Sequence, residues 1–341
     1  MKKLPLISIL FLLIVSCGSK KETFNDYFTN EKSINLTNEI EELIDIIQKP
    51  YSICYIDSNF IISNTDCDSL VTIYNMRNQQ TKNLFHKGFG PNEILNEPYI
   101  SNGKNSNELL VLDNLSGKLY NIDLENDYSI NQDTTFTTRC EQILYDDTLQ
   151  FSCLSAKEYQ YELTTPNELK YFGDVRKIFN NDSIEVENVL GGFSTISQKN
   201  KKICLGWIIG DILEIFDYSN INDIKLSKSL ILNFPKMEME EMIFGNINIG
   251  INSITSNDDY IFALYSGNKL SIVEQMVDES EILLCKNILV FDWEGNPIIK
   301  FSLDKKVKSI YYSKETNLLY CLGINEQGAY SIFTFDINKN I

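Results

Sequence analysis

Histidine is almost absent from this chain, since His86 is the only one among 341 residues. A zinc, copper or iron centre built from several histidines is therefore excluded, and a Ser-His-Asp or Cys-His mechanism would have to use His86 itself. The C-x-x-C spacing that binds metals is also missing. We accordingly expect no metal and no cofactor, and we interpret His86 as a solvated loop residue.

The chain also lacks an apolar run long enough to span a bilayer. The longest one near its start begins at Leu4 and has about twelve residues, against the ~20 that a membrane helix needs. Two lysines precede it, so residues 1–16 are predicted to be a cleaved signal peptide. Ile14 to Cys17 (IVSC) resembles the lipobox, where signal peptidase II cuts before a diacylated cysteine. The resemblance implies lipidation of Cys17, and the alternative is an ordinary secretory signal.

Lipidation of Cys17 would place the protein in the cell envelope, with the membrane as its first partner. No aspartate stands at the second position of the predicted mature chain, which favours the outer membrane over retention at the inner one. Periplasmic and exterior orientations both stay open.

Basic side chains are scarce relative to acidic ones. The chain has 30 Lys and Arg against 47 Asp and Glu, a formal charge of −17, and loss of Lys2 and Lys3 with the signal leaves 28 against 47, or −19. Such a field repels phosphate backbones, so nucleic acid is not an expected partner.

Helical periodicity is nearly absent after about residue 51, where short apolar runs alternate with Asn, Asp, Gly and Ser. One strong strand recurs six times and is followed each time by a second strand that ends in a polar turn. The six strong strands begin near Phe60, Leu109, Leu149, Ile203, Ile261 and Leu319.

This repeat predicts an all-β fold, a six-bladed β-propeller with four-stranded antiparallel blades. Periods of about 40 to 58 residues match one propeller blade. A large β-sandwich also has regularly spaced short strands, but it does not require the same two-strand phrase six times.

The last unit ends directly after its third strand, so an N-terminal strand is predicted to complete it. Residues 33–36 are the candidate strand, and a short amphipathic helix over residues 38–47 is the alternative. The predicted organisation is a signal peptide (1–16), a lipidated tether (17–32) and the propeller (33–341).

Long loops are predicted to gather on one face of the ring. They are residues 85–98, residues 235–245, where a short helix is expected, and residues 266–287, a candidate flap. Because binding sites concentrate in loops on rigid scaffolds, this long-loop face is the candidate binding surface.

The most motif-like of these loops runs from His86 to Glu93 (HKGFGPNE). Gly88 and Gly90 permit backbone conformations closed to other residues, Pro91 stiffens the exit, and Glu93 presents a carboxylate. No lysine-threonine pair follows, so phosphate binding is not indicated and a structural role between blades is favoured.

The G-x-G-P-x-E phrase at residues 88–93, the phrase VFDWEGNP at residues 290–297 and the lipobox together resemble the TolB-like six-bladed β-propeller lipoproteins of Gram-negative bacteria. The resemblance implies the propeller fold and an envelope location. It implies no catalytic residue.

Seven cysteines remain besides Cys17, and most lie within apolar runs. Cys140 and Cys153 are equidistant from a turn near Asp146 and would face each other across a hairpin. They are predicted to form either a cross-strand disulfide or two reduced core thiols.

These patterns favour a lipid-anchored, non-catalytic binding or scaffold module for a protein, peptide or glycan. The alternative is a carboxylate-based hydrolase or lyase acting on an envelope polymer, because spacing alone does not show which acids converge.

Deleting residues 33–40 should make thermal unfolding less cooperative, because the last blade would lose its closing strand. Circular dichroism melting of the full chain and the truncated chain tests this. Identical melting curves would show that the N-terminal strand does not close the ring.

Overall fold

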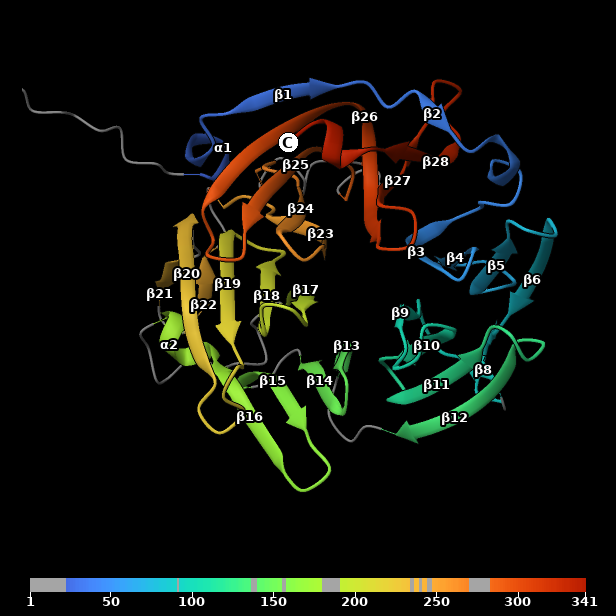
Figure 1. Ribbon diagram of the computed structural model, residues 1–341, viewed down its shortest axis with the longest axis horizontal. Helices are drawn as coiled ribbons and strands as arrows, with labels where there is room; N and C mark the ends of the chain where they lie inside the picture. Colours follow the sequence, from blue (N-terminus) through green and yellow to red (C-terminus); the bar gives the residue numbers. More distant parts are fainter. Residues whose placement is uncertain are drawn as a thin grey trace, which may run out of the picture.

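A computed structural model describes residues 23–90, 92–135, 140–154, 158–179, 191–233, 236–238, 241–243, 247–269 and 283–341. In this part of the chain the blades stand around a central axis, as Figure 1 shows face on. Four blades are separate four-stranded antiparallel sheets, and the long strand β26 joins the other two into one eight-stranded sheet. The predicted all-β propeller with four-stranded blades is confirmed. The predicted signal peptide and Cys17 lie outside the described residues.

The first three blades are simple meanders in which each strand pairs with the next. Blade one has β3 (Pro50–Ile56), β4 (Asn59–Asn64), β5 (Val71–Asn75) and β6 (Gln80–Leu84). Blade two has β9 (Tyr99–Asn102), β10 (Glu108–Asp113), β11 (Lys118–Asp123) and β12 (Ser129–Thr135). Blade three has β13 (Cys140–Asp146), β14 (Leu149–Leu154), β15 (Tyr159–Thr164) and β16 (Leu169–Asp174), and α2 (Val175–Phe179) follows it.

Blades four to six complete the ring. Blade four has β17 (Gly192–Ser197), β18 (Lys202–Trp207), β19 (Asp211–Asp217) and β20 (Lys225–Asn233). Blade five has β23 (Ile251–Ser256), β24 (Tyr260–Tyr265), β25 (Cys285–Asp292) and the first part of β26 (Pro297–Ser313). Blade six has the second part of β26, then β27 (Leu318–Ile324) and β28 (Tyr330–Phe335).

The six strong strands of the sequence repeat are the second strands of the blades: β4, β10, β14, β18, β24 and β27. Each packs against neighbouring blades through both faces, so it reads as an almost continuous apolar run. In β4, for example, Phe60, Ile61 and Ile62 are all buried, and Ile61 and Ile62 belong to different interblade cores.

The last blade is closed by an N-terminal strand, as predicted, but not by the predicted residues. β2 (Asn38–Glu39) pairs antiparallel with β28, and the backbone N–H of Ile40 donates to the Ile332 carbonyl oxygen at 2.9 Å. The 3-10 turn η1 (Glu41–Leu43) follows and buries Leu43 between blades six and one. A second 3-10 turn, η4 (Ile337–Lys339), ends the chain's regular structure.

The residues that we expected to close blade six lie instead on blade five. β1 (Glu31–Ile34) runs parallel to the first part of β26, with Ile34 opposite Leu303. An ion pair of 2.9 Å between Lys300 Nζ and Glu31 Oε2 supports this position. The prediction failed because two short strands follow each other here, and only their partners distinguish them.

The predicted tether also extends too far, because residues 23–32 lie on the propeller. Thr23 caps the short helix α1 (Phe24–Tyr27), and Phe24 is fully buried between blades four and five. Its ring makes edge contacts with Tyr265 and Phe291, at centroid distances of 5.6 and 5.8 Å. Figure 1 shows α1 at the rim of the ring, beside the end of β20. Although the segment is polar overall and was predicted to be a tether, the burial of its aromatic side chains attaches it to the ring.

Outside the blades, the predicted helix at residues 235–244 is wrong. β21 (Lys236–Glu238) and β22 (Glu241–Ile243) form a two-stranded antiparallel hairpin there. The helix was predicted because it would place Met239, Met242 and Ile243 on one side, but the pairing of Met237 with Met242 sets a strand register. No helix in the described part of the chain is long and apolar enough to cross a bilayer.

A buried carboxylate lies beside the docked N-terminal segment. Asp211 is fully buried at the start of β19 and accepts a hydrogen bond of 2.7 Å from Asn248 Nδ2. Burial raises the pKa of Asp211 to about 6, against the lowering effects of the Tyr265 hydroxyl, Asn248 and the Phe24 backbone N–H. The folded state therefore holds a proton on Asp211 at pH values where the unfolded chain has released it.

This difference predicts that Asp211 stabilises the fold less as pH rises. Its pKa is higher in the folded state than its ordinary 3.8, so the contribution is present at low pH and is lost as pH rises through about 6. Between pH 4.5 and 7.5 the loss is about 2 kcal/mol. Urea unfolding at both pH values tests this. The free energy of unfolding of Asp211→Asn, relative to that of the wild type, should be about 2 kcal/mol higher at pH 7.5 than at pH 4.5.

Asp217→Asn is the matched control on the same strand. The hydroxyl and backbone N–H of Ser219 lower the pKa of Asp217. Relative to the wild type, Asp217→Asn should therefore lose stability as pH rises, whereas Asp211→Asn should gain it. Equal pH dependence of the wild type and Asp211→Asn would refute the assignment.

Candidate functional site

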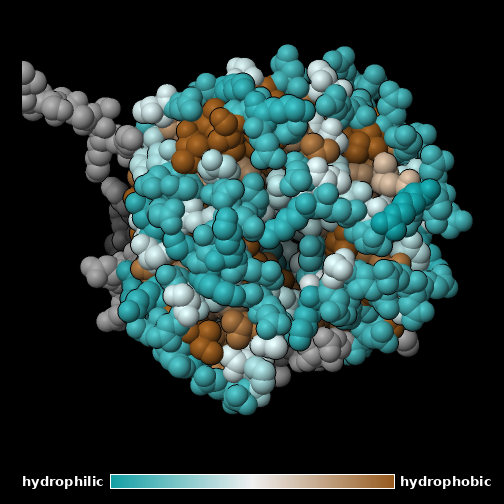
Figure 2. Space-filling view, in the orientation of Figure 1, coloured by the Kyte–Doolittle hydropathy of each residue, from teal (hydrophilic) through white to brown (hydrophobic). Residues whose placement is uncertain are grey.

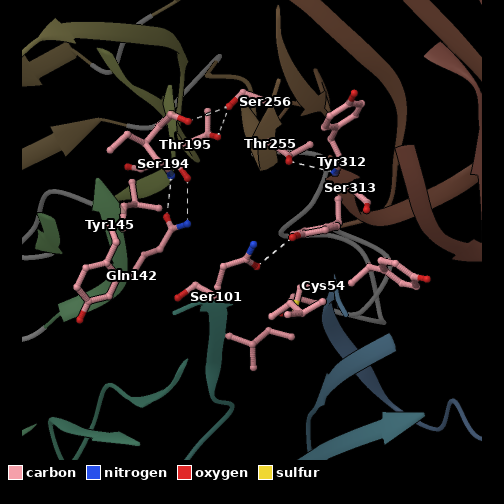
Figure 3. A pocket seen from close by; sticks show the side chains of 18 of the residues that line it. Cys54, Ser101, Gln142, Tyr145, Ser194, Thr195, Thr255, Ser256, Tyr312 and Ser313 are labelled. Carbon is pink, nitrogen blue, oxygen red and sulfur yellow. Dashed lines mark hydrogen bonds between the residues drawn. The ribbon is translucent and has the colours of Figure 1, made fainter. Parts of the chain in front are cut away.

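The central axis of the ring holds a cavity of about 520 Å³. Its wall is formed by the innermost strands of all six blades: β3, β9, β13, β17, β23 and the second part of β26. Figure 3 shows these strands converging with their side chains, and a hollow is visible near the centre of the ring in Figure 2.

The lining residues within these six strands are all uncharged. They are hydroxyl, amide, aromatic and aliphatic side chains, among them Tyr51, Tyr99, Ser101, Asn102, Gln142, Ser194, Thr195, Thr255 and Tyr311. Charged lining residues come only from the turns that follow the inner strands, namely Asp57, Lys104, Asp147, Lys314 and Glu315. The cavity therefore has a neutral interior and a charged mouth.

Side chains join the inner strands of neighbouring blades where no backbone partner is present. The amide of Gln142 on β13 bridges to β17 with two hydrogen bonds of 2.9 Å. Its Nε2 donates to the Ser194 carbonyl oxygen, and its Oε1 accepts from the Ser194 N–H (Figure 3). One side chain thus satisfies both backbone groups of a strand edge.

Blades four, five and six are joined in the same way. Ser253 Oγ on β23 accepts from the Ile310 N–H at 3.1 Å, and Thr255 Oγ1 accepts from the Tyr312 N–H at the same distance. The hydroxyls of Thr195 and Ser256 lie 2.7 Å apart, between β17 and β23. These contacts fix one half of the cavity wall.

In the other half, one hydrogen bond connects two blades that are not neighbours. The Tyr311 hydroxyl on β26 donates to Asn102 Oδ1 on β9 at 2.9 Å, so it reaches past blade one. Burial raises the pKa of Tyr311, which keeps this hydroxyl protonated as a donor. Nearby, the rings of Tyr51 and Tyr99 meet edge to face with centroids 5.9 Å apart. This half of the wall is the more aromatic one.

Buried carboxylates with perturbed acidity do not line the cavity. Burial raises the pKa of Glu214, which accepts hydrogen bonds from Gln160 Nε2 at 2.8 Å and Trp207 Nε1 at 3.2 Å between blades three and four. Asp211 lies beside the N-terminal segment. At the cavity mouth, Asp57 forms an ion pair of 2.8 Å with Arg77. Among the described residues, no group of three potential metal ligands is present.

The glycine loop predicted as a candidate binding feature is a rigid structural turn. β7 (His86–Lys87) pairs parallel with β8 (Glu93–Ile94), and Glu93 Oε2 accepts from the Gly90 N–H at 2.6 Å. A Cβ atom on Gly88 would lie 2.1 Å from Glu93 Oε2, and one on Gly90 would lie 2.9 Å away. A side chain at either position would therefore displace the Glu93 carboxylate from its hydrogen bond with the Gly90 N–H. Pro91 lies outside the described residues.

The loop contributes nothing to the cavity lining. His86 is exposed, and its Nδ1 lies 2.5 Å from the Asp68 carbonyl oxygen, to which it donates. The loop precedes β9, whereas the charged mouth follows the ends of the inner strands, so the two lie at opposite ends of the ring axis. Residues 270–282 of the predicted flap lie outside the described residues, and their role stays a prediction.

Cys140 and Cys153 lie on neighbouring strands but not directly opposite each other. A bulge after Cys140 places it opposite Leu154, and Cys153 faces Gln142. Both thiols are free and buried, and burial raises their pKa values, that of Cys140 to about 12. They are inert core residues in this structure.

Sequence reasoning missed the cavity wall, although the sequence carries a signal for it. Five of the six inner strands combine serine or threonine with isoleucine or an aromatic residue, as in YSICYI, YIS, FSTIS, NSITS and KSIYYS, and β13 departs from this pattern. The hydroxyls of Thr195, Ser253 and Thr255 bond to the adjacent inner strand. Those of Ser52 and Ser194 bond away from the axis, to Ser63 and Tyr161.

The fold and the residue pattern define a β-propeller of the TolB type. The TolB-like 6-blade propeller-like family model matches residues 23–315, and the chain belongs to this family. The match begins at the N-terminal cap of α1, so it includes the docked segment. A search of curated proteins found no match.

Two solved structures share the architecture. A member of the DUF4221 family from Bacteroides vulgatus is 16% identical with a TM-score of 0.55, and the match covers 92% of this chain and 98% of that one. Hydrazine synthase from Kuenenia stuttgartiensis is 12% identical with a TM-score of 0.51, with coverage of 80% and 73%. At these identities the likeness concerns the fold alone.

A double-mutant cycle tests the structural role of the glycine loop. Gly88→Ala should lower the free energy of unfolding by about 1–3 kcal/mol, because the methyl group displaces the Glu93 carboxylate from the Gly90 N–H. In a Glu93→Ala background the same substitution should cost far less. Equal costs in the two backgrounds, measured by urea unfolding, would contradict this packing.

Proposed function

We propose that this protein is a lipid-anchored, non-catalytic binding module of the cell envelope, and that its central cavity binds a short neutral glycan. The observation that carries the proposal is the uncharged wall of the cavity in a chain with a formal charge of −17. A charged ligand would lack a partner there, and its desolvation would be uncompensated.

The size and chemistry of the cavity support a ligand of this class. Its volume of about 520 Å³ lies within the usual range for small-ligand sites. Tyrosine and phenylalanine rings offer flat apolar surfaces for sugar rings, while Ser101, Asn102 and Thr195 offer hydroxyl and amide groups for sugar hydroxyls. Many of these groups are already held by hydrogen bonds, so little side-chain entropy is lost on binding.

The hydrolase or lyase alternative has less support. Such chemistry needs two carboxylates flanking one bond, and acids with raised pKa values are its usual mark. Within the described ranges, Asp211 and Glu214 are the carboxylates whose pKa is raised, and both lie outside the cavity lining. The cavity wall itself offers hydrogen bonding but no proton transfer.

The anchoring part of the proposal rests on the sequence IVSC at residues 14–17. Diacylation of Cys17 would hold the ring at a membrane, and the absence of a following aspartate favours the outer membrane.

Binding of neutral disaccharides and trisaccharides to the non-acylated chain, followed by calorimetry, tests the cavity. Ser101→Glu places a carboxylate in the neutral wall and should weaken binding at least tenfold. Ser229→Glu adds the same charge on the exposed outer strand of blade four and serves as the control. Equal affinities for the two variants, or binding only of anionic ligands, would exclude the cavity as the glycan site.

A further inference from the structure

Docking of the N-terminal segment shortens the connection between the ring and the proposed lipid anchor. Thr23 caps α1 and Phe24 is fully buried, so the chain is fixed to the ring from this point onward. Six residue steps separate Cys17 from Thr23. Even fully extended, they span at most about 20 Å. A domain of some 320 residues has a diameter of roughly 50 Å, so the ring has no freedom to turn every side toward the membrane.

The point where the chain leaves the ring lies next to the outer strand of blade four. Phe24 contacts Asp211 through its backbone N–H, and Asp211 begins β19. The next residue on that strand, Ile212, pairs with Ile231 of β20. Figure 1 shows the same arrangement, with α1 at the rim close to the end of β20.

The outer surface of β20 is unusually apolar. Leu226 and Ile231 are 48% and 41% exposed, although most large apolar side chains of this protein are buried. Two further exposed side chains, Leu169 and Tyr171, lie on β16, the outer strand of the adjacent blade three. These outer strands thus hold four of the seven exposed large apolar residues in the described part of the chain.

The charge of β20 also differs from that of the whole chain. Its sequence, KLSKSLILN, has no acidic residue and two lysines, of which Lys225 forms an ion pair of 2.9 Å with Asp223 and Lys228 is half-buried. An edge strand with exposed aliphatic side chains and lysines suits the interface between lipid headgroups and acyl chains. A strongly acidic surface would be repelled there.

We propose that β20, the outer strand of blade four, rests on the lipid surface into which the acyl chains of Cys17 insert. The proposal rests on the lipidation stated above but not on glycan binding. The ring then stands on its rim, with its axis along the membrane plane. The charged mouth of the central cavity then faces solution rather than lipid, so the anchor does not block a ligand.

Tryptophan quenching by brominated lipids tests this contact. The acylated full-length protein is placed in vesicles of phosphatidylethanolamine and phosphatidylglycerol, with or without bromine on the acyl chains. In each variant, the fluorescence of the introduced tryptophan is compared between brominated and unbrominated vesicles. The fraction quenched should be at least twice as large in Leu226→Trp and Ile231→Trp as in Leu115→Trp. Leu115 is 58% exposed and lies on blade two, across the ring from α1, so it is a matched control. The native Trp207 and Trp293 are buried and give a constant background.

Three results would overturn the proposal. Equal quenching at positions 226 and 115 would show that the rim of blade four is not preferred. Protection of β20 by self-association, seen as dimers that dissociate in Leu226→Ser, would assign the strand to a second copy. Failure of the wild type to float with vesicles, as Cys17→Ala should fail, would remove the anchor itself. Only the last result also refutes the lipidated part of the proposed function, and none affects the calorimetric test of the cavity.

Discussion

Closure of the ring by residues from both ends of the chain is the constraint on which the rest of the structure depends. β2 supplies the outer strand of blade six, and Asn325 Nδ2 donates to Glu39 Oε1 at 3.0 Å to support it. Residues 23–47, which we call the N-terminal strap, contact more than this blade. They fill the space between blades four and five through Phe24, extend blade five through β1, and bury Leu43 between blades six and one. The strap therefore joins four of the six blades.

A closed ring creates a problem at its axis, where six inner strands present edges without backbone partners. Unpaired N–H and C=O groups are costly when buried and prone to pairing with other chains when exposed. Uncharged polar side chains pair with some of these backbone groups here. Gln142, Ser253 and Thr255 each form a hydrogen bond with the backbone of the next inner strand. A charged side chain at these positions would find no opposite charge among the uncharged residues of the cavity wall. The same requirement that stabilises the ring thus keeps the cavity neutral.

The sequence predicted the blades well because their second strands are buried on both faces. A continuous apolar run such as FII at residues 60–62 predicts a buried strand even when the strands that pair with it are unknown. β1 and β2 carried no such signal, since their pairing is set by Leu303 and Phe333, far away in the chain. The cavity was missed for a related reason. Its wall combines short strands from six blades, and Tyr311 and Asn102 become neighbours only when the ring closes. In the glycine loop, by contrast, the contacts of Gly88 and Gly90 with Glu93 are local in the sequence.

The strap also determines how a pull from the membrane would reach the fold. Tension at residue 22 acts first on α1, where Phe24 and Phe28 pack against Phe291 with ring centroids 5.8 and 5.0 Å apart. It acts next on β1, which is held by its ladder to β26 and by the ion pair between Glu31 and Lys300. Only after both have detached would β2 and the closure of blade six bear load. Since the chain order places the shorter strand behind these two attachments, they would protect the ring and its cavity from movements of the proposed anchor.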